Sequence, residues 1–96
     1  MASVPESDDV ASRFGANLRL HRRAAGLTQE DVAFLASVHR TEIGLLERGR
    51  RTPRIDTLVR VATAVSVSPT DLLDGITWEL PTTNEGRIKI VSREDE

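Results

Sequence analysis

The chain has 96 residues, with 13 basic and 15 acidic side chains and a formal net charge of -2. This length fits one domain and argues against a large multi-layer enzyme fold, because so short a chain buries only about 60–65% of its unfolded surface. The lack of cysteine excludes disulfide frameworks, thiolate zinc sites and cysteine nucleophiles. No apolar run is long enough to cross a membrane, and the acidic start is unlike a signal peptide, so we expect a cytoplasmic protein with no membrane partner.

Charge is distributed unevenly along the chain. Residues 13–60 carry ten arginines against five acidic residues, a net +5, whereas residues 1–12 carry -3 and residues 61–96 carry -4. Clustered arginine is what a phosphate-facing surface needs, because counterion release supplies much of the affinity for nucleic acid. A solvated charged surface is the alternative interpretation, and charge alone favours it.

Residues 1–8 are small and polar without apolar periodicity, and we expect them to be disordered. A first helix follows, and the candidates for its N-terminal cap are Ser7, Asp8 and Asp9. The spacing of one helical face is shared by Val10, Phe14, Leu18 and Ala25. Gly26, after two arginines and two alanines, is a helix stop signal.

Two short helices are predicted next. Thr28 and Asp31 resemble a capping box, so a second helix begins there and spans about residues 29–36. Ser37 interrupts it, and a third helix spans about residues 39–48. Its inward-facing residues are predicted to be Ile43 and Leu46.

A fourth helix is predicted at about residues 55–65, with an apolar stripe of Ile55, Leu58, Ala62 and Val65. Ser68 and Pro69 begin a short fifth helix, which Gly75 closes. The period then changes to alternation in ITWEL and RIKIV, which flank the turn-rich PTTNEG and predict a β-hairpin at residues 76–91. A lone hairpin is marginal in water, so it must pack on its own helices or pair with another subunit. Residues 92–96 form a polar tail.

One long segment, AGLTQEDVAFLASVHRTEIGLLERGRRTPRIDTLVRVATAVSVSPTDLL, resembles the phage-repressor-like (Cro-type, XRE-type) helix-turn-helix family. The strongest elements are GLTQEDVA, the I-x-x-L-E-R-G block, P-x-x-x-T-L and S-P-T-D-L-L, which are specific in this order although each alone is weak. With the first helix included, the resemblance covers about residues 10–75. It implies a mainly α fold, a five-helix lambda-repressor-like DNA-binding domain at residues 9–75. The C-terminal hairpin extends this domain and lies outside the core family. The candidate dimerisation elements are the hairpin, the fifth helix (residues 69–74) and the segment of residues 65–68.

The resemblance also implies roles for individual residues. Those at positions that look into the major groove are Arg40, Thr41, Gly44 and Leu45. Those expected to contact DNA phosphates are Thr28, Gln29, His39, Arg48, Arg50, Arg51 and Arg54. Arg40 is the best candidate for direct readout, because its fork binds guanine O6 and N7 together. Leu45 replaces a residue that is often polar and offers only apolar contact.

Some of these roles have alternatives. The arginines after the third helix are either phosphate contacts or a solvated basic loop, and a minor-groove contact is a further alternative for Arg51 or Arg54. Gly44, expected on the exposed face, either lets the helix backbone approach DNA or is a poor helix residue tolerated at the surface. His39 either contacts a phosphate or caps the third helix.

An ion pair between Arg22 and Glu47 is implied as well, joining the ends of the first and third helices; two independent surface charges are the alternative. The chain departs from the family at Ser37, where a turn glycine is usual. Phe34 and Leu35 occupy positions that are often polar, and we expect something to cover them, with the hairpin as one candidate.

A sequence-specific regulator of transcription is therefore the leading hypothesis. It would bind an inverted-repeat operator in double-stranded DNA as a homodimer, because one short helix reads only about four to five base pairs and two half-sites about 34 Å apart restore specificity. We expect it to act as a repressor or autoregulator. An antitoxin or other protein-interaction module that keeps the fold is the alternative, favoured by the net charge of -2 and disfavoured by the basic segment.

An enzyme has almost no support, since the chain lacks a phosphate loop and any Ser-His-Asp motif. We expect no cofactor and no small-molecule ligand. We also expect no metal site, because His21 and His39 lack ligand spacing. The expected location is the bacterial cytoplasm, with association to the nucleoid when bound to DNA.

Overall fold

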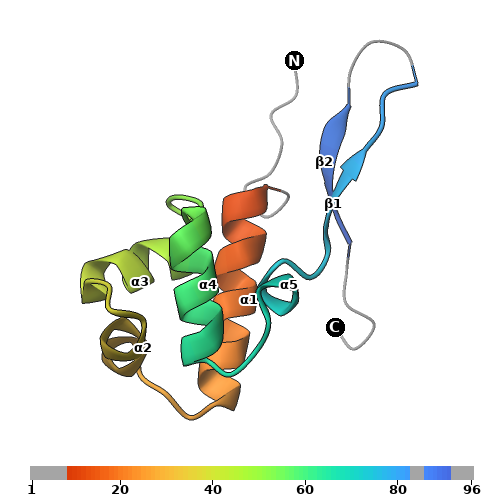
Figure 1. Ribbon diagram of the computed structural model, residues 1–96. Coiled ribbons are helices and arrows are strands. Elements are labelled where there is room, and N and C mark those ends of the chain that lie inside the picture. Colours follow the sequence, from red (N-terminus) through yellow and green to blue (C-terminus); the bar gives the residue numbers. More distant parts are fainter. Residues whose placement is uncertain (1–8, 83–85, 92–96) are drawn as a thin grey trace.

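The computed structural model describes residues 9–82 and 86–91. The elements are, in order, α1 (Val10–Ala24), α2 (Gln29–Ala36), α3 (Arg40–Glu47), α4 (Ile55–Ala64), α5 (Pro69–Leu72), β1 (Ile76–Glu79) and β2 (Arg87–Ile90). The helices gather into one bundle and the hairpin projects beyond it (Figure 1). The predicted mainly α fold with a C-terminal hairpin is confirmed. The expectations for residues 1–8, for residues 83–85 of the PTTNEG turn and for residues 92–96 lie outside the described residues.

Capping side chains mark the starts of α1, α2, α3 and α5, whereas α4 begins without one. Asp9 starts α1, where its Oδ1 accepts a hydrogen bond from the Ser12 amide at 2.7 Å. The predicted capping box of Thr28 and Asp31 is present at α2, and a second one starts α5. α5 ends earlier than predicted, at Leu72. No helix in the described part of the chain is long and apolar enough to span a membrane.

The core draws apolar side chains from all five helices. Those that are fully buried are Phe14, Leu18, Val32, Ile43, Leu46, Val61, Ala62 and Leu72. The inward orientation predicted for Ile43 and Leu46 is confirmed. Two members of the predicted stripes are exposed instead: Ala25 forms the C-cap of α1 and Ile55 opens α4, so each lies where its helix leaves the core.

Phe34 and Leu35 are not covered by the rest of the chain. They are 83% and 55% exposed, because α2 buries the opposite face that carries Val32, Ala33 and Ala36. The hairpin contacts α1 rather than α2. The expectation that this pair is covered, with the hairpin as a candidate, is therefore wrong for the single chain.

Two polar side chains of α1 fix the hairpin to the bundle. Arg13, only 9% exposed, donates from Nε to the Asp74 carbonyl at 3.2 Å and from Nη2 to the Val91 carbonyl at 2.8 Å. Asn17, fully buried, donates from Nδ2 to the Leu72 and Asp74 carbonyls at 2.9 and 3.0 Å. The base of the hairpin thus packs on its own chain.

Candidate DNA interface

α2 and α3 pack against each other and form the helix-turn-helix unit. The turn between them places Ser37 in the left-handed region, with φ 56°. Its amide bonds back to the Phe34 carbonyl at 3.2 Å, and the Val38 amide bonds to the Ala33 carbonyl at 3.0 Å, a pairing that satisfies the end of α2. Serine thus takes the conformation usually left to glycine, at a cost of about 1 kcal/mol or somewhat more.

His39 is the N-cap of α3. Its Nδ1 accepts a hydrogen bond from the Thr41 amide at 3.1 Å, which uses one of the N–H groups that a helix start leaves without an acceptor. The capping role considered for His39 is thus present, and the phosphate contact stays a prediction. The ring is exposed on the surface that also carries Arg40.

The start of α3 presents the side chains predicted to read bases. Arg40 and Thr41 are exposed, and Leu45 is half-buried one turn later. Gly44, by contrast, is buried, because the guanidinium of Arg48 lies over it: a Cβ on Gly44 would stand 3.1 Å from Arg48 Nη1. The expectation that Gly44 is exposed is wrong, since a long side chain four residues further on folds back across it.

A shallow cleft of about 340 Å³ runs between the starts of α2 and α3, lined by Arg22, Leu27, Thr28, Gln29, Glu30 and Arg40. Thr28 Oγ1 accepts from the Asp31 amide at 3.0 Å, and Asp31 Oδ2 accepts from the Thr28 amide at 2.8 Å. These bonds, the backbone one foremost, lower the pKa of Asp31. A helix start with its partial positive charge suits an anion such as phosphate.

Arg40 already has an acidic neighbour in this cleft. Its Nη1 donates to Glu30 Oε2 at 3.2 Å, and the two side chains are 64% and 73% exposed. An ion pair this exposed contributes only about 0–1 kcal/mol, so Arg40 leaves it at little cost.

Glu47 at the end of α3 is the centre of a buried polar cluster. Its side chain is fully buried and receives a bidentate pair from Arg22, at 2.6 Å from Nε and 3.0 Å from Nη2. Gln29 Nε2 adds a hydrogen bond at 3.1 Å, and Arg19 Nε lies at 3.5 Å. The ion pair that the family resemblance implies between Arg22 and Glu47 is formed and joins α1 to α3, and Gln29 connects α2 to the same carboxylate.

The charge of Glu47 is well compensated. Burial alone raises the pKa of Glu47, but the hydrogen bonds from Arg22 and Gln29 and the charges of Arg22 and Arg19 outweigh it and hold the pKa below its ordinary value. The hydrogen bond to Glu47 in turn raises the pKa of Arg22. The carboxylate of Glu47 is therefore ionised, its charge is balanced by Arg22 and Arg19, and it is turned inward rather than toward DNA.

The loop after α3 supplies further positive charge. Four arginines are exposed there: Arg48, Arg50, Arg51 and Arg54. Arg51 Nη1 donates to Glu42 Oε1 at 3.1 Å, and Arg54 Nε lies 3.4 Å from Asp56 Oδ1. These partners, like Glu30, are acidic side chains of the same surface.

Sequence reasoning missed two parts of this surface. It did not foresee that the side-chain amide of Gln29 bonds to Glu47, and it did not include Arg19 in the Glu47 cluster. It also did not foresee that acidic side chains pair with Arg40 and Arg51. No signal in the sequence singles out Glu30 or Glu42 among the acidic residues. Within the described residues, no group of three acidic or histidine side chains is arranged to hold a metal ion.

A model of the helix-turn-helix domain family matches residues 13–74. The chain belongs to this family. Control protein C.BamHI of Bacillus amyloliquefaciens is 35% identical over 69 residues, which cover 71% of this chain and 85% of that protein. The solved structure of the restriction-modification controller protein C.AhdI from Aeromonas hydrophila is 39% identical, with a TM-score of 0.63, and the match covers 65% of this chain and 94% of that one.

A third similar protein extends further along the chain. The structure of a hypothetical transcription factor from Neisseria, NHTF, is 28% identical with a TM-score of 0.66, and covers 85% of this chain and 87% of that one. The resemblance to XRE-type regulators is confirmed: the chain is a DNA-binding helix-turn-helix regulator of transcription. Its relatives are regulators rather than enzymes.

Proposed function

We propose that the chain is a sequence-specific regulator that binds an inverted-repeat operator in double-stranded DNA as a homodimer, with the start of α3 in the major groove. The observation that carries this proposal is the exposure of Arg40 and Thr41 beside the start of α2, on a surface flanked by exposed arginines. Sequence is read at base edges, whereas phosphate contacts fix register, and this surface offers both kinds of side chain.

The proposed contacts divide along the same line. Arg40 contacts guanine, Thr41 a base edge or a thymine methyl, and Leu45 makes apolar contact. Phosphate contacts are assigned to the start of α2 with Thr28 and Gln29, to His39, and to the loop arginines Arg48, Arg50, Arg51 and Arg54. When Arg48 turns outward to a phosphate, it uncovers Gly44 and lets the backbone of α3 lie close to the DNA.

The homodimer follows from the shortness of α3. Eight residues of helix contact only about four to five base pairs, and two half-sites about 34 Å apart give an operator specific enough for a genome. Repression or autoregulation is the proposed action, supported by the names of C.BamHI and C.SmaI as control proteins and of C.AhdI as a restriction-modification controller.

A protein-interaction module, such as an antitoxin, is the second candidate. The exposed Phe34 and Leu35 on α2 favour it, because large apolar side chains side by side in solvent mark contact surfaces. In that case the basic surface would act only together with a partner chain.

Selection of genomic DNA fragments by the purified protein at near-physiological salt tests the proposal. We expect sequencing of the retained fragments to yield an inverted repeat, and the Arg40→Ala variant to lose one conserved base pair in each half. Retention of fragments without any shared sequence, by protein that is folded in circular dichroism, would contradict the proposal and favour the protein-interaction module.

A further inference from the structure

The hairpin has one apolar face that leaves the core and enters solvent. In the antiparallel pair, Ile76 stands opposite Ile90 and Trp78 opposite Ile88, and opposite residues share a face. Ile76 packs against the core, whereas Trp78 and Ile88 are 57% and 39% exposed. By alternation Leu80 continues the same face, and it is 76% exposed.

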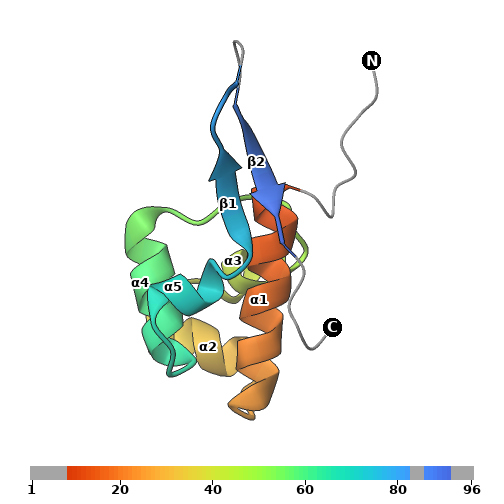
Figure 2. The same ribbon diagram turned by 90° about the vertical axis from the view of Figure 1, so that its right-hand side faces the viewer.

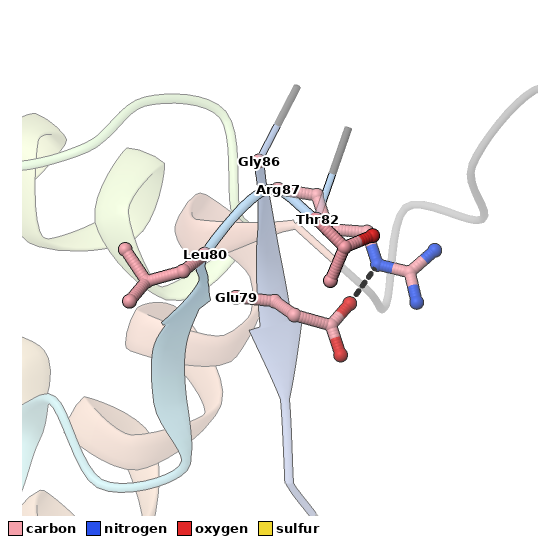
Figure 3. A pocket seen from close by; sticks show the side chains of 5 residues that line it. All are labelled: Glu79, Leu80, Thr82, Gly86 and Arg87. Atoms are coloured by element: carbon pink, nitrogen blue, oxygen red, sulfur yellow. Dashed lines mark hydrogen bonds and ion pairs between the residues drawn. The ribbon is translucent and has the colours of Figure 1, made fainter. Parts of the chain in front are cut away.

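The other face of the hairpin is polar and internally paired. It carries Thr77, Glu79, Arg87 and Lys89. Arg87 Nε donates to Glu79 Oε1, and Figure 3 shows this pair on one side of the hairpin with Leu80 directed to the other. A hollow of about 370 Å³ beside the pair is lined by Glu79, Leu80, Thr82, Gly86 and Arg87. Among the described residues, the apolar face therefore carries no charged side chain.

The apolar face is held in position rather than folded back on the helices. At the outer end the indole of Trp78 lies against Gly86, where a Cβ would stand 2.3 Å from its Cζ2. At the base, Gly75 has φ +83°, and a Cβ there would stand 2.6 Å from the Val91 carbonyl oxygen and from Arg13 Nη2. The approach at Gly75 fixes the base of the hairpin to Arg13 of α1, and the approach at Gly86 fixes the indole within the hairpin. The apolar face is therefore displayed in advance of any partner.

We propose that this face packs against the same face of a second copy of the chain, and that it is the dimer interface. This rests on the homodimer of the proposed function and assigns its contact surface. An interface between identical chains around a two-fold axis must be complementary to itself, and an uncharged apolar face meets its own copy without like charges. The charged side chains, Lys89 among them, lie on the opposite face, where they protect the strand edges from irregular pairing.

The position of the hairpin also suits a dimer contact. Figures 1 and 2 agree in placing it on the side of α1 and α5, with those helices and α4 between it and α3. A second chain docked there leaves the start of α3 open to DNA. A stable interface buries about 1,200 Å² or more, so the contact extends beyond the hairpin to Leu73 at the end of α5, which is 37% exposed.

Site-directed cross-linking tests the proposal directly, because the chain contains no cysteine. A single Leu80→Cys variant, treated with a short bis-maleimide, is expected to give a covalent dimer. Phe34→Cys is the matched control: it places the thiol at a more exposed apolar position on α2 and is expected to stay monomeric on a denaturing gel. Efficient cross-linking at Phe34→Cys and none at Leu80→Cys would overturn the proposal.

Sedimentation equilibrium of the full chain gives the second readout. Leu80→Asp and Ile88→Lys are each expected to weaken dimerisation by about 30-fold or more, the effect of losing an interface hot spot, with the far-ultraviolet circular dichroism unchanged. Phe34→Lys is expected to leave the dimer intact. A dimer that persists in both hairpin variants, or a wild-type chain that is monomeric at tens of micromolar, contradicts the proposal.

Failure of this proposal is distinguishable from failure of the proposed function. A monomeric hairpin variant keeps the α3 surface, so it is expected to bind a single half-site as the wild type does. A hairpin dimer that binds no DNA sequence would refute the function and leave the interface standing. Sequence-specific DNA binding by a dimer whose interface lies elsewhere would support the proposed function and refute the hairpin interface.

Discussion

α3 carries an arginine–glutamate ion pair at each end, and the two pairs differ in burial and in the number of hydrogen bonds. At its end, Glu47 is fully buried and Arg22 is 12% exposed, with two hydrogen bonds between them. At its start, Arg40 and Glu30 share one hydrogen bond and are both more than half exposed. The same arginine–glutamate contact is thus a buried, doubly hydrogen-bonded ion pair at the end of α3 and an exposed, singly hydrogen-bonded one at its start.

The difference shows how environment assigns a role to a charge. Removing one partner of a buried pair leaves an uncompensated charge, which is costly, whereas an exposed pair is screened by water and salt. The end of α3 therefore holds the helix against α1 and α2. The start keeps its arginine available for a different anion or base edge.

The largest expected effect on stability comes from breaking the buried ion pair of Arg22 and Glu47. Arg22→Ala leaves Glu47 buried without its main partner and is expected to lower the free energy of unfolding by about 3–5 kcal/mol. Urea denaturation measures it. Arg40→Ala is the matched control and is expected to change stability by less than about 0.5 kcal/mol; similar losses in both variants would erase the distinction between the two pairs.

The next largest effect is expected on DNA binding and concerns Arg40, at the start of α3. Arg40→Ala is expected to cost about 1–3 kcal/mol of binding at one base pair in each half-site and to relax the preference there. Binding titrations against operator variants measure it. Arg50→Ala serves as the control, since loss of a phosphate contact weakens all sequences evenly and reduces the salt slope by about 1. The same uniform loss in both variants would exclude direct readout by Arg40.

Low pH should weaken the buried ion pair of Arg22 and Glu47, because it protonates the carboxylate. The pKa of Glu47 is lowered in the folded chain, so the carboxylate contributes stability above its ordinary pKa and loses it as the pH falls through the lowered value. We expect the free energy of unfolding to fall as the pH drops below the ordinary glutamate pKa of 4.5, and to fall less in Glu47→Gln. Asp31 and Asp71, whose pKa values are also lowered, provide the same background in both chains. Parallel pH curves would show that Glu47 does not contribute.

The smallest expected effect comes from removing the charge of Glu30, the exposed partner of Arg40. Glu30→Gln removes an exposed charge next to Arg40 and is expected to leave stability unchanged within about 1 kcal/mol. It should strengthen DNA binding slightly, because a carboxylate near phosphates is repelled. Thermal melts and salt titrations measure the two quantities. A large loss of stability would show that this pair is not loose.

Much of this molecule follows from local sequence. Capping boxes, glycine stops and apolar spacing depend on neighbouring residues, and they predicted the order and type of every element in the described part of the chain. The ion pair of Arg22 and Glu47 is not a local feature and followed only from the family resemblance.

What the sequence did not predict depends on long side chains reaching across space. Arg13 and Asn17 look like solvent-facing residues of α1, yet they satisfy carbonyl groups some 55 to 78 residues further on. Gly44 is buried only because Arg48 folds back over it. Phe34 and Leu35 look like core residues by composition, but the helix turns them outward.

Where DNA contacts the chain is the central question, and amide chemical shifts in a titration with operator duplex answer it directly. We predict that the largest shifts fall at the start of α2, at residues 39–45 of α3 and in the loop of residues 48–54, with Glu47 and the hairpin little changed. Shifts concentrated on the hairpin or on the exposed face of α4, with α3 unchanged, would contradict the account.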